Sequence, residues 1–479
     1  MNKELIIDCF AGGGGASVGI EMALGRQVDI AINHDDKAIL MHKTNHRHTI
    51  HLTEDIFSVD LEKYTKGQPV GLLWASPDCR SFSKAKGSAP RSASVRMLPW
   101  AVYKHAKALL PNVIIMENVE EIQQWGPLDD NGQPIKEKMG EEYNLFIESM
   151  KRLGYAFDSK ELVAADYGAP TTRKRWYAIF RRDGRPIVWP KATHSKDGLD
   201  GLKKWVPASE VLDFTNVGKS IFGRKRPLAE KTLNRIAMGI KKYVVEDPEP
   251  FIVTVNHGGE NFRGQKTDKP MPTITSKHGF GVVSFDSIPL DDKAAVFLTK
   301  FYNTCIGQSV KEPLHTITTS PGHFGQVSVR MVKVDDLIKA GIDADKAEKC
   351  TEVSNFIVKY YGCGEGQSVN EPLHTITTKD RFALITVLGN KYAIVDIYLR
   401  MLTAEELKLA QGFPKDYIIS RDYRWRDYPV KEQVARIGNS VVPIMAQKLV
   451  ESNVGYMKMG ERQPSPIVYT LENGQVAFA

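Results

Sequence analysis

Residues 5–15 read LIIDCFAGGGG, an apolar run that ends in four consecutive glycines. The apolar run predicts a buried strand, Leu5–Phe10, and the glycines predict a tight turn into a helix. Nucleotide-like cofactors bind where such a turn follows a parallel strand. Two interpretations stay open at this point, a cofactor site and a plain tight turn. No Gly-Lys-Ser/Thr follows, which disfavours a phosphate-binding loop.

Four more apolar runs follow, separated by stretches with helical patterns. They predict buried strands at Val28–Asn33, Gly71–Ser76, Val113–Asn118 and Trp176–Phe180. Apolar residues at helical spacing predict a helix over residues 143–153, which ends at Gly154. This alternation predicts an α/β fold, with a parallel sheet covered by helices on both faces.

From about residue 185 the chain is rich in glycine, proline and threonine, which predicts a domain boundary. Related segments with a central Thr-Ile-Thr occur three times, at residues 269–277, 312–320 and 371–379. Thr-Ile-Thr favours a strand, and each copy follows a turn that contains proline. The copies are too far apart for a tight solenoid, and the longer gap carries a helix-like insert, Val334–Cys350.

Helical patterns return after Arg400. Thr403-Ala-Glu-Glu406 predicts a capping box and Gly412 a stop, so we expect a helix over about 404–411. A final helix is expected after Gly438-Asn-Ser-Val-Val-Pro443. The C-terminal segment is therefore expected to pack back onto the first domain.

Cys79 stands in Ser76-Pro-Asp-Cys-Arg-Ser-Phe-Ser83, directly after a predicted strand. A lone cysteine is often a small buried apolar residue. Its loop position and basic neighbours instead favour a reactive thiolate. Glu117 ends the next parallel strand, so that a thiolate and a carboxylate would converge on one small substrate. The alternative is that Glu117 caps a helix.

The charge of the chain is mildly basic, with 64 basic against 57 acidic side chains. Basic residues gather between Arg80 and Arg96 and again between Lys219 and Lys242. Such runs are often solvated faces, but in a protein that handles a nucleobase they would meet a phosphate backbone.

The five cysteines are scattered, and no pair has the C-x-x-C spacing of a zinc site. We therefore expect reduced thiols and no metal. No apolar stretch is long enough to cross a membrane, and the start of the chain has no signal-peptide pattern. We expect a soluble, cytoplasmic protein of a bacterium or of a phage-infected cell.

Taken in order, these motifs resemble the series found in the cytosine-5 DNA methyltransferases. The motifs that carry the resemblance are Asp8-Cys-Phe-Ala-Gly-Gly-Gly-Gly15, Ser76-Pro-Asp-Cys79, Glu117-Asn-Val119, Tyr167-Gly-Ala-Pro-Thr-Thr-Arg-Lys-Arg175, Leu402–Pro414 and Gly438-Asn-Ser-Val441. The resemblance covers roughly residues 1–185 and 395–455. It implies a Rossmann-like methyltransferase domain that uses S-adenosyl-L-methionine, with an inserted β-rich target-recognition domain.

The resemblance implies a covalent mechanism on a cytosine that is flipped out of duplex DNA. Cys79 would add to carbon 6 of the base, and Glu117 would bind N3 and the amino group. Arg173 and Arg175, which match the family's Arg-x-Arg, would hold the base and the adjacent backbone. Methyl transfer to carbon 5, loss of its proton and release of Cys79 would complete the reaction.

The resemblance also assigns a set of cofactor-binding residues. The first motif supplies an aromatic ring near the adenine and a glycine loop, and the late motif closes over the cofactor. Another motif supplies the acid for the adenine, and a polar residue after the second strand would serve the ribose. The full set is Phe10, Ala11, Gly12, Gly14, Gly15, His34, Asp35, Asp55, Ile56, Asp78, Asn439, Ser440 and Val441.

The chain departs from the family pattern beside the nucleophile. Asp78 replaces the usual proline and Arg80 the usual glutamine, while Thr171 replaces the glutamine of the arginine motif. An extra carboxylate would raise the pKa of the thiol, and Arg80 would offset it. Together with His34 and the repeats, these departures resemble a phage or prophage branch.

Double-stranded DNA is the expected partner, and we expect a monomer. The residues expected to contact DNA are Arg80, Ser83, Lys84, Lys86, Lys277, Lys379 and Arg381. Residues 1–185 would form the catalytic and cofactor-binding domain, and 186–395 the target-recognition domain with the three Thr-Ile-Thr repeats. Residues 396–455 would complete the catalytic domain, and 456–479 would form a tail.

Two other functions stay open. A tRNA cytosine-5 methyltransferase has the same Cys nucleophile and Glu-Asn-Val motif on the same fold. The long insertion favours DNA as the substrate. A catalytically silent DNA-binding homologue is the other alternative, and Cys79, Glu117, Arg173 and Arg175 argue against it.

Overall fold

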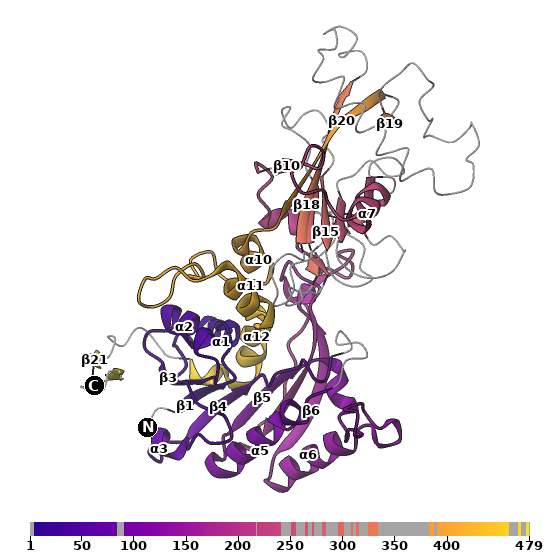
Figure 1. Ribbon diagram of the computed structural model, residues 1–479. Coiled ribbons are helices and arrows are strands. Elements are labelled where there is room, and N and C mark those ends of the chain that lie inside the picture. Colours follow the sequence, from indigo (N-terminus) through magenta and orange to yellow (C-terminus); the bar gives the residue numbers. More distant parts are fainter. Residues whose placement is uncertain are drawn as a thin grey trace.

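The computed structural model describes residues 4–83, 91–216, 218–240 and 390–458. Between residues 241 and 389, and after residue 458, it describes short strands and Pro313. A seven-stranded sheet lies in one half of the molecule and a nine-stranded sheet in the other, with α10 and α11 between them (Figure 1).

The seven-stranded sheet has the order β3-β2-β1-β4-β5-β7-β6. Its strands are β1 (Leu5–Cys9), β2 (Ile30–Ile32), β3 (Ile50–Leu52), β4 (Val70–Ala75), β5 (Val113–Asn118), β6 (Ala156–Val163) and β7 (Lys174–Arg181). Strands β1 to β5 are parallel, and the order of the strands reverses between β1 and β4. Ligands of doubly wound folds bind at such a reversal.

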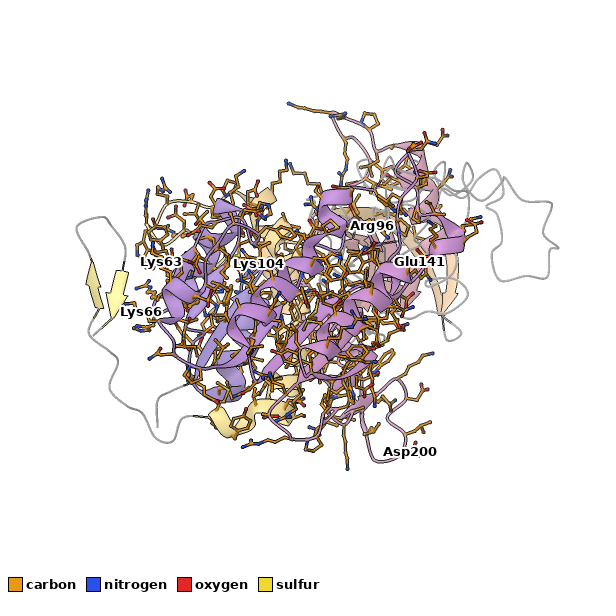
Figure 2. All side chains as sticks on the ribbon, turned by 90° about the horizontal axis from the view of Figure 1, so that it is seen from below. Lys63, Lys66, Arg96, Lys104, Glu141 and Asp200 are labelled. Carbon is orange, nitrogen blue, oxygen red and sulfur yellow. The ribbon has the colours of Figure 1, made fainter. Side chains whose placement is uncertain are left out.

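Helices cover both faces of this sheet, as the sequence predicts. The core on one face includes α5 (Leu98–Leu109) and α6 (Glu141–Arg152), and α3 (Glu62–Thr65) lies on the same side. Figure 2 shows this face from below, where Lys63, Lys104 and Glu141 mark the three helices. The core on the opposite face includes α1 (Gly15–Leu24) and α12 (Pro443–Val454).

The expected fully parallel sheet is wrong at one edge. Strand β7 pairs antiparallel with both β5 and β6. Only residues 164–173 join β6 to β7, and a parallel return needs a longer crossover. Strand β6 was not predicted because it is an edge strand without a buried apolar run. Strand β3 was missed because its sequence, Ile-His-Leu, is not an apolar run and only Leu52 is buried.

The C-terminal segment packs back onto the sheet, as predicted. Met445, Leu449 and Val454 of α12 join the same core cluster as Ile6 and Ile20. Gly19 lets the two helices approach, because a Cβ there would lie 2.2 Å from the carbonyl oxygen of Pro443.

The helix boundaries in this segment agree closely with the sequence, with one omission. Helix α10 (Ala404–Ala410) begins at the predicted capping box of Thr403 and Glu406, and Gly412 follows it in the left-handed region. Helix α11 (Val430–Asn439) was not predicted. The remaining helices are α2 (Asp36–Asn45), α4 (Ala93–Arg96) and α7 (Glu230–Ile240).

The second sheet is built mainly of antiparallel strands that pair across long distances in the sequence. Its strands are β10 (Lys219–Ser220), β11 (Phe251–Thr254), β12 (Gly264–Lys266), β14 (Phe280–Val283), β15 (Val296–Lys300), β16 (Gln308–Ser309), β18 (Phe324–Lys333), β19 (Ala383–Val387) and β20 (Asn390–Met401). Three small pairs lie outside both sheets: β8 (His194–Ser195) with β9 (Lys203–Lys204), β13 (Met271–Pro272) with β17 (Leu314–His315), and β21 (Val468–Thr470) with β22 (Val476–Phe478).

Two copies of the internal repeat meet at equivalent positions. Met271 pairs in parallel with Leu314, and Pro272 with His315. These residues stand at the same places in the first and second copies. The strands before them are equivalent too, because β12 returns antiparallel on β11 as β16 does on β15. The Thr-Ile-Thr residues and the predicted helix 334–350 lie outside the described residues.

A buried ion pair in the chain that leaves the second sheet also hydrogen-bonds the backbone of the chain that enters it. Both terminal nitrogens of Arg400, at the end of β20, donate to the carboxylate of Glu406, at 2.8 and 2.9 Å. The same carboxylate accepts from the backbone N–H groups of Asp213 and Thr403. Arg400 also donates to the carbonyl oxygens of Asp213 and Asn216. We call this the Arg400–Glu406 network.

Glu406→Gln should destabilise the protein by about 3 kcal/mol, because it leaves the buried Arg400 without a counter-ion. Glu148→Gln is the matched control, since the Glu148 side chain is 57% exposed and its ion-pair partner Lys151 is exposed too, so stability should change by less than about 0.5 kcal/mol. Urea unfolding of both variants measures the difference. Equal midpoints would show that the Arg400–Glu406 network adds nothing to stability.

Candidate active site

The glycine loop leaves β1 through a strained residue. Phe10 has a φ of 67°, a left-handed conformation that is rare for an aromatic residue and is found at functional sites. The N–H of Gly12 donates to the carbonyl oxygen of Phe10 at 2.6 Å, which closes the turn. Helix α1 then begins at Gly15, with Gly14 at a φ of 87°. The chain therefore turns sharply at the carboxyl end of β1, beside the strand reversal.

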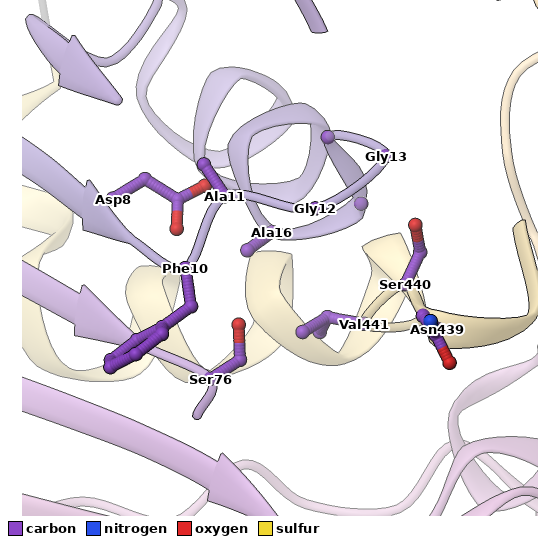
Figure 3. Close-up of a pocket in the computed structure, with 12 residues that line it drawn as sticks. Asp8, Phe10, Ala11, Gly12, Gly13, Ala16, Ser76, Asn439, Ser440 and Val441 are labelled. Atoms are coloured by element: carbon purple, nitrogen blue, oxygen red, sulfur yellow. The ribbon is translucent and has the colours of Figure 1, made fainter. Parts of the chain in front are cut away.

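A pocket lies between this loop and the segment Asn439–Val441 (Figure 3). Eight residues assigned from the resemblance line it: Phe10, Ala11, Gly12, Gly14, Gly15, Asn439, Ser440 and Val441. Four further residues line it that were given no role: Asp8, Gly13, Ala16 and Ser76. The structure thus brings together residues that lie about 430 positions apart in the chain.

The pocket suits a ligand on one side and is closed by protein on the other. A Cβ on Gly12 would meet only the carbonyl oxygen of Phe10, at 3.9 Å, so the space above Gly12 is open. A Cβ on Gly15 would lie 2.0 Å from the carbonyl oxygen of Val441. One on Gly14 would lie 2.2 Å from the hydroxyl of Tyr417. Gly14 and Gly15 therefore admit the C-terminal segment, and Gly12 leaves room for the ligand.

Tyr417 is a member of this site that the sequence did not single out. Its hydroxyl donates to the carbonyl oxygen of Gly13 at 2.7 Å, and its ring is buried. No local pattern signals this contact, because the two residues are 404 positions apart.

Five residues expected at the cofactor do not line this pocket. Asp35 caps α2 and forms an ion pair with Arg436. Ile56 is buried in the core, and Asp55 is exposed and accepts from the N–H of Phe57. The other two are His34, which is exposed, and Asp78, which pairs with Arg80. Their assignment to the cofactor rests on the resemblance alone.

Cys79 follows β4 in a half-buried loop at the same edge of the sheet. Burial raises the pKa of its thiol, and the carboxylates of Asp78 and Glu117 raise it further. The guanidinium groups of Arg175 and Arg173 lower it. These two guanidinium groups come from the start of β7. Arg80, the basic neighbour expected to offset Asp78, forms an ion pair with it, with Nε 2.7 Å from Oδ2, and also interacts with the charge of Cys79.

Glu117, Arg173 and Arg175 form a buried charge cluster next to Cys79. The Oε1 atom of Glu117 lies 3.2 Å from Nε of Arg175 and 3.8 Å from a terminal nitrogen of Arg173. The cluster forms because β7 is antiparallel and therefore begins where β5 ends. Arg173 also donates to the carbonyl oxygen of Gly438 at 3.1 Å, just before Asn439. The charge cluster thus touches the segment that closes the pocket.

Several atoms of this cluster have no hydrogen-bond partner among the described residues. They are Oε1 of Glu117 and the Nε atoms of Arg173 and Arg175, and all three are buried. Buried polar atoms normally find partners. A charge cluster whose buried polar atoms lack hydrogen bonds within the described residues is therefore suited to a polar ligand such as a nucleobase.

Asn118 fixes the relative positions of the two chemical loops. Its side-chain amide donates to the carbonyl oxygen of Pro77 at 3.0 Å, two residues before Cys79. Its own oxygen accepts from the N–H of Val119 at 2.9 Å. The motif Glu117-Asn-Val119 contained this residue, but nothing in the sequence showed which loop it contacts.

The residues expected to meet DNA are only partly described. Arg80 is exposed at the surface and Ser83 lies in the Cys79 loop. Lys84, Lys86, Lys277, Lys379 and Arg381 lie outside the described residues. Arg96 does not belong to an exposed basic face, because it is buried and donates to the carbonyl oxygens of Ser81 and Gly126. It braces the Cys79 loop instead.

Asp78→Asn should lower the pKa of Cys79, because one of the charges that raise it is removed. The thiol should then react with iodoacetamide at lower pH than in the unchanged protein. Mass spectrometry of the Cys79 peptide across pH 6 to 9 measures this shift. Asp130→Asn, in a distant exposed turn, serves as the control. Identical pH profiles for Cys79 in both variants would exclude Asp78 as a determinant of thiol reactivity.

None of the helices in the described part of the chain is long and apolar enough to cross a membrane. Within the same residues, no three metal-binding side chains lie close enough together to hold an ion.

A family model described as C-5 cytosine-specific DNA methylase matches residues 5–454. The type II methyltransferase M.SacI of Streptomyces achromogenes is 28% identical over 242 residues, which are 45% of this chain and 56% of that protein. The match thus spans about half the length of that relative. The type II methylase M.HgiDII of Herpetosiphon aurantiacus is 26% identical over 304 residues, 60% of this chain and 80% of that protein. The crystal structure of the S. pombe Dnmt2 methyltransferase is 12% identical, with a TM-score of 0.46, and covers 95% of this chain and 98% of that one.

Proposed function

The chain belongs to the C-5 cytosine-specific DNA methylases, and from this we propose that it transfers a methyl group to carbon 5 of cytosine in DNA. The observation that supports this most strongly is the convergence of Cys79 with Glu117, Arg173 and Arg175. This cluster lies at the edge of the sheet where the glycine pocket opens. A nucleophile and a set of unpaired polar atoms would therefore face one base.

In the proposed reaction the thiolate of Cys79 adds to carbon 6 of a flipped-out cytosine. The new sulfur–carbon bond moves the electron pair of the 5,6 double bond to carbon 5. Glu117 would accept a hydrogen bond from the amino group of the base and, when it carries a proton, donate one to N3, where negative charge builds as sulfur adds. After methylation, a solvent water takes the proton from carbon 5, and the departure of the Cys79 thiolate restores the double bond.

Arg173 and Arg175 have two tasks in this proposal. They favour the thiolate of Cys79, since both lower the pKa of the thiol. They also hold the Glu117 carboxyl group in place, because their guanidinium groups lie 3.2 and 3.8 Å from its Oε1. Their guanidinium groups would also hold the base and its adjacent backbone.

The pocket would hold S-adenosyl-L-methionine, which supplies an activated methyl group when bound. Phe10 would lie against the adenine, and Gly12 would let the backbone approach the ligand closely. Asn439, Ser440 and Val441 would close the pocket from the other side. Ser440 is held for this, since its hydroxyl donates to Arg436 and its carbonyl oxygen accepts from Gln411.

Incubation with radiolabelled S-adenosyl-L-methionine and either duplex DNA or tRNA tests the proposal. We expect label in duplex DNA, at carbon 5 of cytosine after digestion to nucleosides. Label in tRNA alone would assign the tRNA methyltransferase alternative. No label in either, with intact DNA binding, would assign a silent DNA-binding homologue.

We also propose that residues 186–395 read the DNA target, with Lys277, Lys379 and Arg381 meeting bases or phosphates. Exchanging this region for that of a relative should change which cytosines are methylated, while affinity for the cofactor stays the same. Methylome sequencing of a host without cytosine methylation measures the change. A chimera that keeps the original target would place the reading residues elsewhere.

Finer points of the proposal concern state and location. We propose a monomer that acts on duplex DNA inside a bacterial or phage-infected cell and needs no metal. Sedimentation as a dimer, or loss of activity with EDTA, would contradict the first or the last of these points.

A further inference from the structure

A chain of hydrogen-bonded side chains leads from the pocket to the far side of α2. The hydroxyl of Ser17 lies 2.6 Å from Oδ2 of Asp8. Nε2 of His42 lies 2.9 Å from the same hydroxyl, and Nδ1 of His42 lies 2.8 Å from Nε2 of His51. Asp8, Ser17 and His42 are fully buried, whereas His51 is half-buried. The chain thus joins β1, α1, α2 and β3.

The inner end of this chain faces the ligand. Asp8 lines the pocket, and its Oδ1 is buried without a hydrogen-bond partner among the described residues. Its carboxylate is visible beside the loop in Figure 3. A buried carboxylate oxygen without a partner is costly unless the group is neutral or a ligand meets it.

The protons of these three hydrogen bonds can be placed in two complete arrangements. When Asp8 is charged, Ser17 donates to Asp8, and Nε2 of His42 donates to Ser17. His51 then donates through Nε2 to the bare Nδ1 of His42. When Asp8 carries a proton, Asp8 donates to Ser17 and Ser17 donates to Nε2 of His42. Nδ1 of His42 then donates to Nε2 of His51, whose own proton sits on Nδ1.

Both arrangements keep every ring neutral, and they differ by one proton. That proton enters at Nδ1 of His51, and each hydrogen bond passes one proton inward until Asp8 is neutral. Burial supports neutral rings, because it lowers the pKa of His42 well below its usual value and that of His51 to about 3. Burial also raises the pKa of Asp8 to about 7, against the hydrogen bond from Ser17.

Most other titratable groups surround the histidines, but Tyr417 also faces Asp8, because the charges of Glu21 and Asp8 add to burial in raising the pKa of Tyr417. The ring of His46 lies 4.4 Å from that of His42, and its Nδ1 lies 3.4 Å from the carboxylate of Glu21. Lys43 lowers the pKa of His51. Tyr417 stacks 5.9 Å from His46. Beside Asp8, among the described residues, stands the buried thiol of Cys9, whose pKa is raised.

We propose that Ser17, His42 and His51 are positioning residues that control the charge of Asp8, and that charged Asp8 makes the pocket prefer a cationic ligand. The inference rests on the proposed cofactor. S-Adenosyl-L-methionine carries a sulfonium charge, and its product S-adenosyl-L-homocysteine has a neutral sulfur. The pocket would therefore retain the methyl donor and release the product, and more so as pH rises.

Calorimetric titration with the two nucleosides from pH 6 to 8.5 tests this. We expect the preference for the methyl donor over the product to rise about fivefold with pH, as one charge appears on Asp8. Ser17→Ala removes the donor that stabilises charged Asp8, so the midpoint of this rise should move to higher pH. Ser17→Thr keeps a hydroxyl and should restore it. His48→Gln, an exposed histidine outside the chain, is the matched control and should leave the midpoint in place.

Infrared spectroscopy gives a readout without any ligand. The protonated carboxyl band that Asp8→Asn removes should titrate at higher pH in Ser17→Ala than in the unchanged protein. A constant preference at all pH values, or an unmoved midpoint in Ser17→Ala, would overturn the inference. Failure of both nucleosides to bind the unchanged protein would instead overturn the proposed function.

Discussion

Replacing Cys79 by serine should reduce methyl transfer to duplex DNA by at least about 10⁴-fold, because removing a covalent nucleophile removes the whole reaction path. The affinity for S-adenosyl-L-methionine should stay nearly unchanged. Cys79 serves the base, and it does not line the pocket formed by the glycine loop and Asn439–Val441. Initial rates with labelled cofactor and calorimetric affinities measure the two effects separately.

A trapping experiment identifies the sulfur directly. Duplex DNA with 5-fluorocytosine at the target should form an adduct that survives denaturing electrophoresis, since fluorine cannot leave as a proton does. Peptide mapping should place the adduct on Cys79. Cys9→Ala is the matched control, because Cys9 is buried in the core and should not change the trapping. An active enzyme that forms no adduct would contradict the assignment of the nucleophile.

Glu117→Gln should lower kcat by about 10²- to 10³-fold while the cofactor still binds. The amide cannot balance Arg173 and Arg175, and it cannot carry the charge that the reacting base needs. Glu120→Gln tests whether loss of any nearby carboxylate suffices, because Glu120 is partly exposed and forms an ion pair with Lys174 at 2.6 Å. We expect that control to keep nearly full activity.

The same variant separates the role of Glu117 at the base from its effect on the thiol. Glu117 raises the pKa of Cys79, so its removal should make the thiol more reactive toward iodoacetamide at neutral pH. Methylation should collapse although the thiolate becomes more abundant. A parallel loss of alkylation and methylation would show that Glu117 acts on Cys79 instead of on the base.

The sequence predicts the strands that carry the chemistry because each is a buried apolar run with a loop motif at its end. It could not predict that β7 is antiparallel, since direction depends on the length of the connection and not on side-chain pattern. That direction is what brings Arg173 and Arg175 beside Glu117. The resemblance assigned Arg173 and Arg175 to the base, and the antiparallel direction of β7 gives the physical reason why they lie beside Glu117.

Residues that act across long sequence distances were the hardest to anticipate. Tyr417 and Asn118 make single hydrogen bonds to backbone carbonyl groups, which any polar side chain in those loops could have made. Arg96 belongs to a basic run by composition, yet it is buried. Charge counted along a sequence does not show which side chains face water, so Arg96 was wrongly counted with that run.

The Arg400–Glu406 network has a consequence for how such proteins exchange segments by recombination. The network joins Asp213 and Asn216, before the chain enters the second sheet, to Arg400, where the chain leaves that sheet. A crossover inside it would bury one charge without its partner. Crossovers between residues 217 and 399 would leave the network intact, whatever sequence they brought in. Recombination can therefore exchange the segment between residues 217 and 399 as a unit, because the ion pair and its backbone partners lie outside that segment.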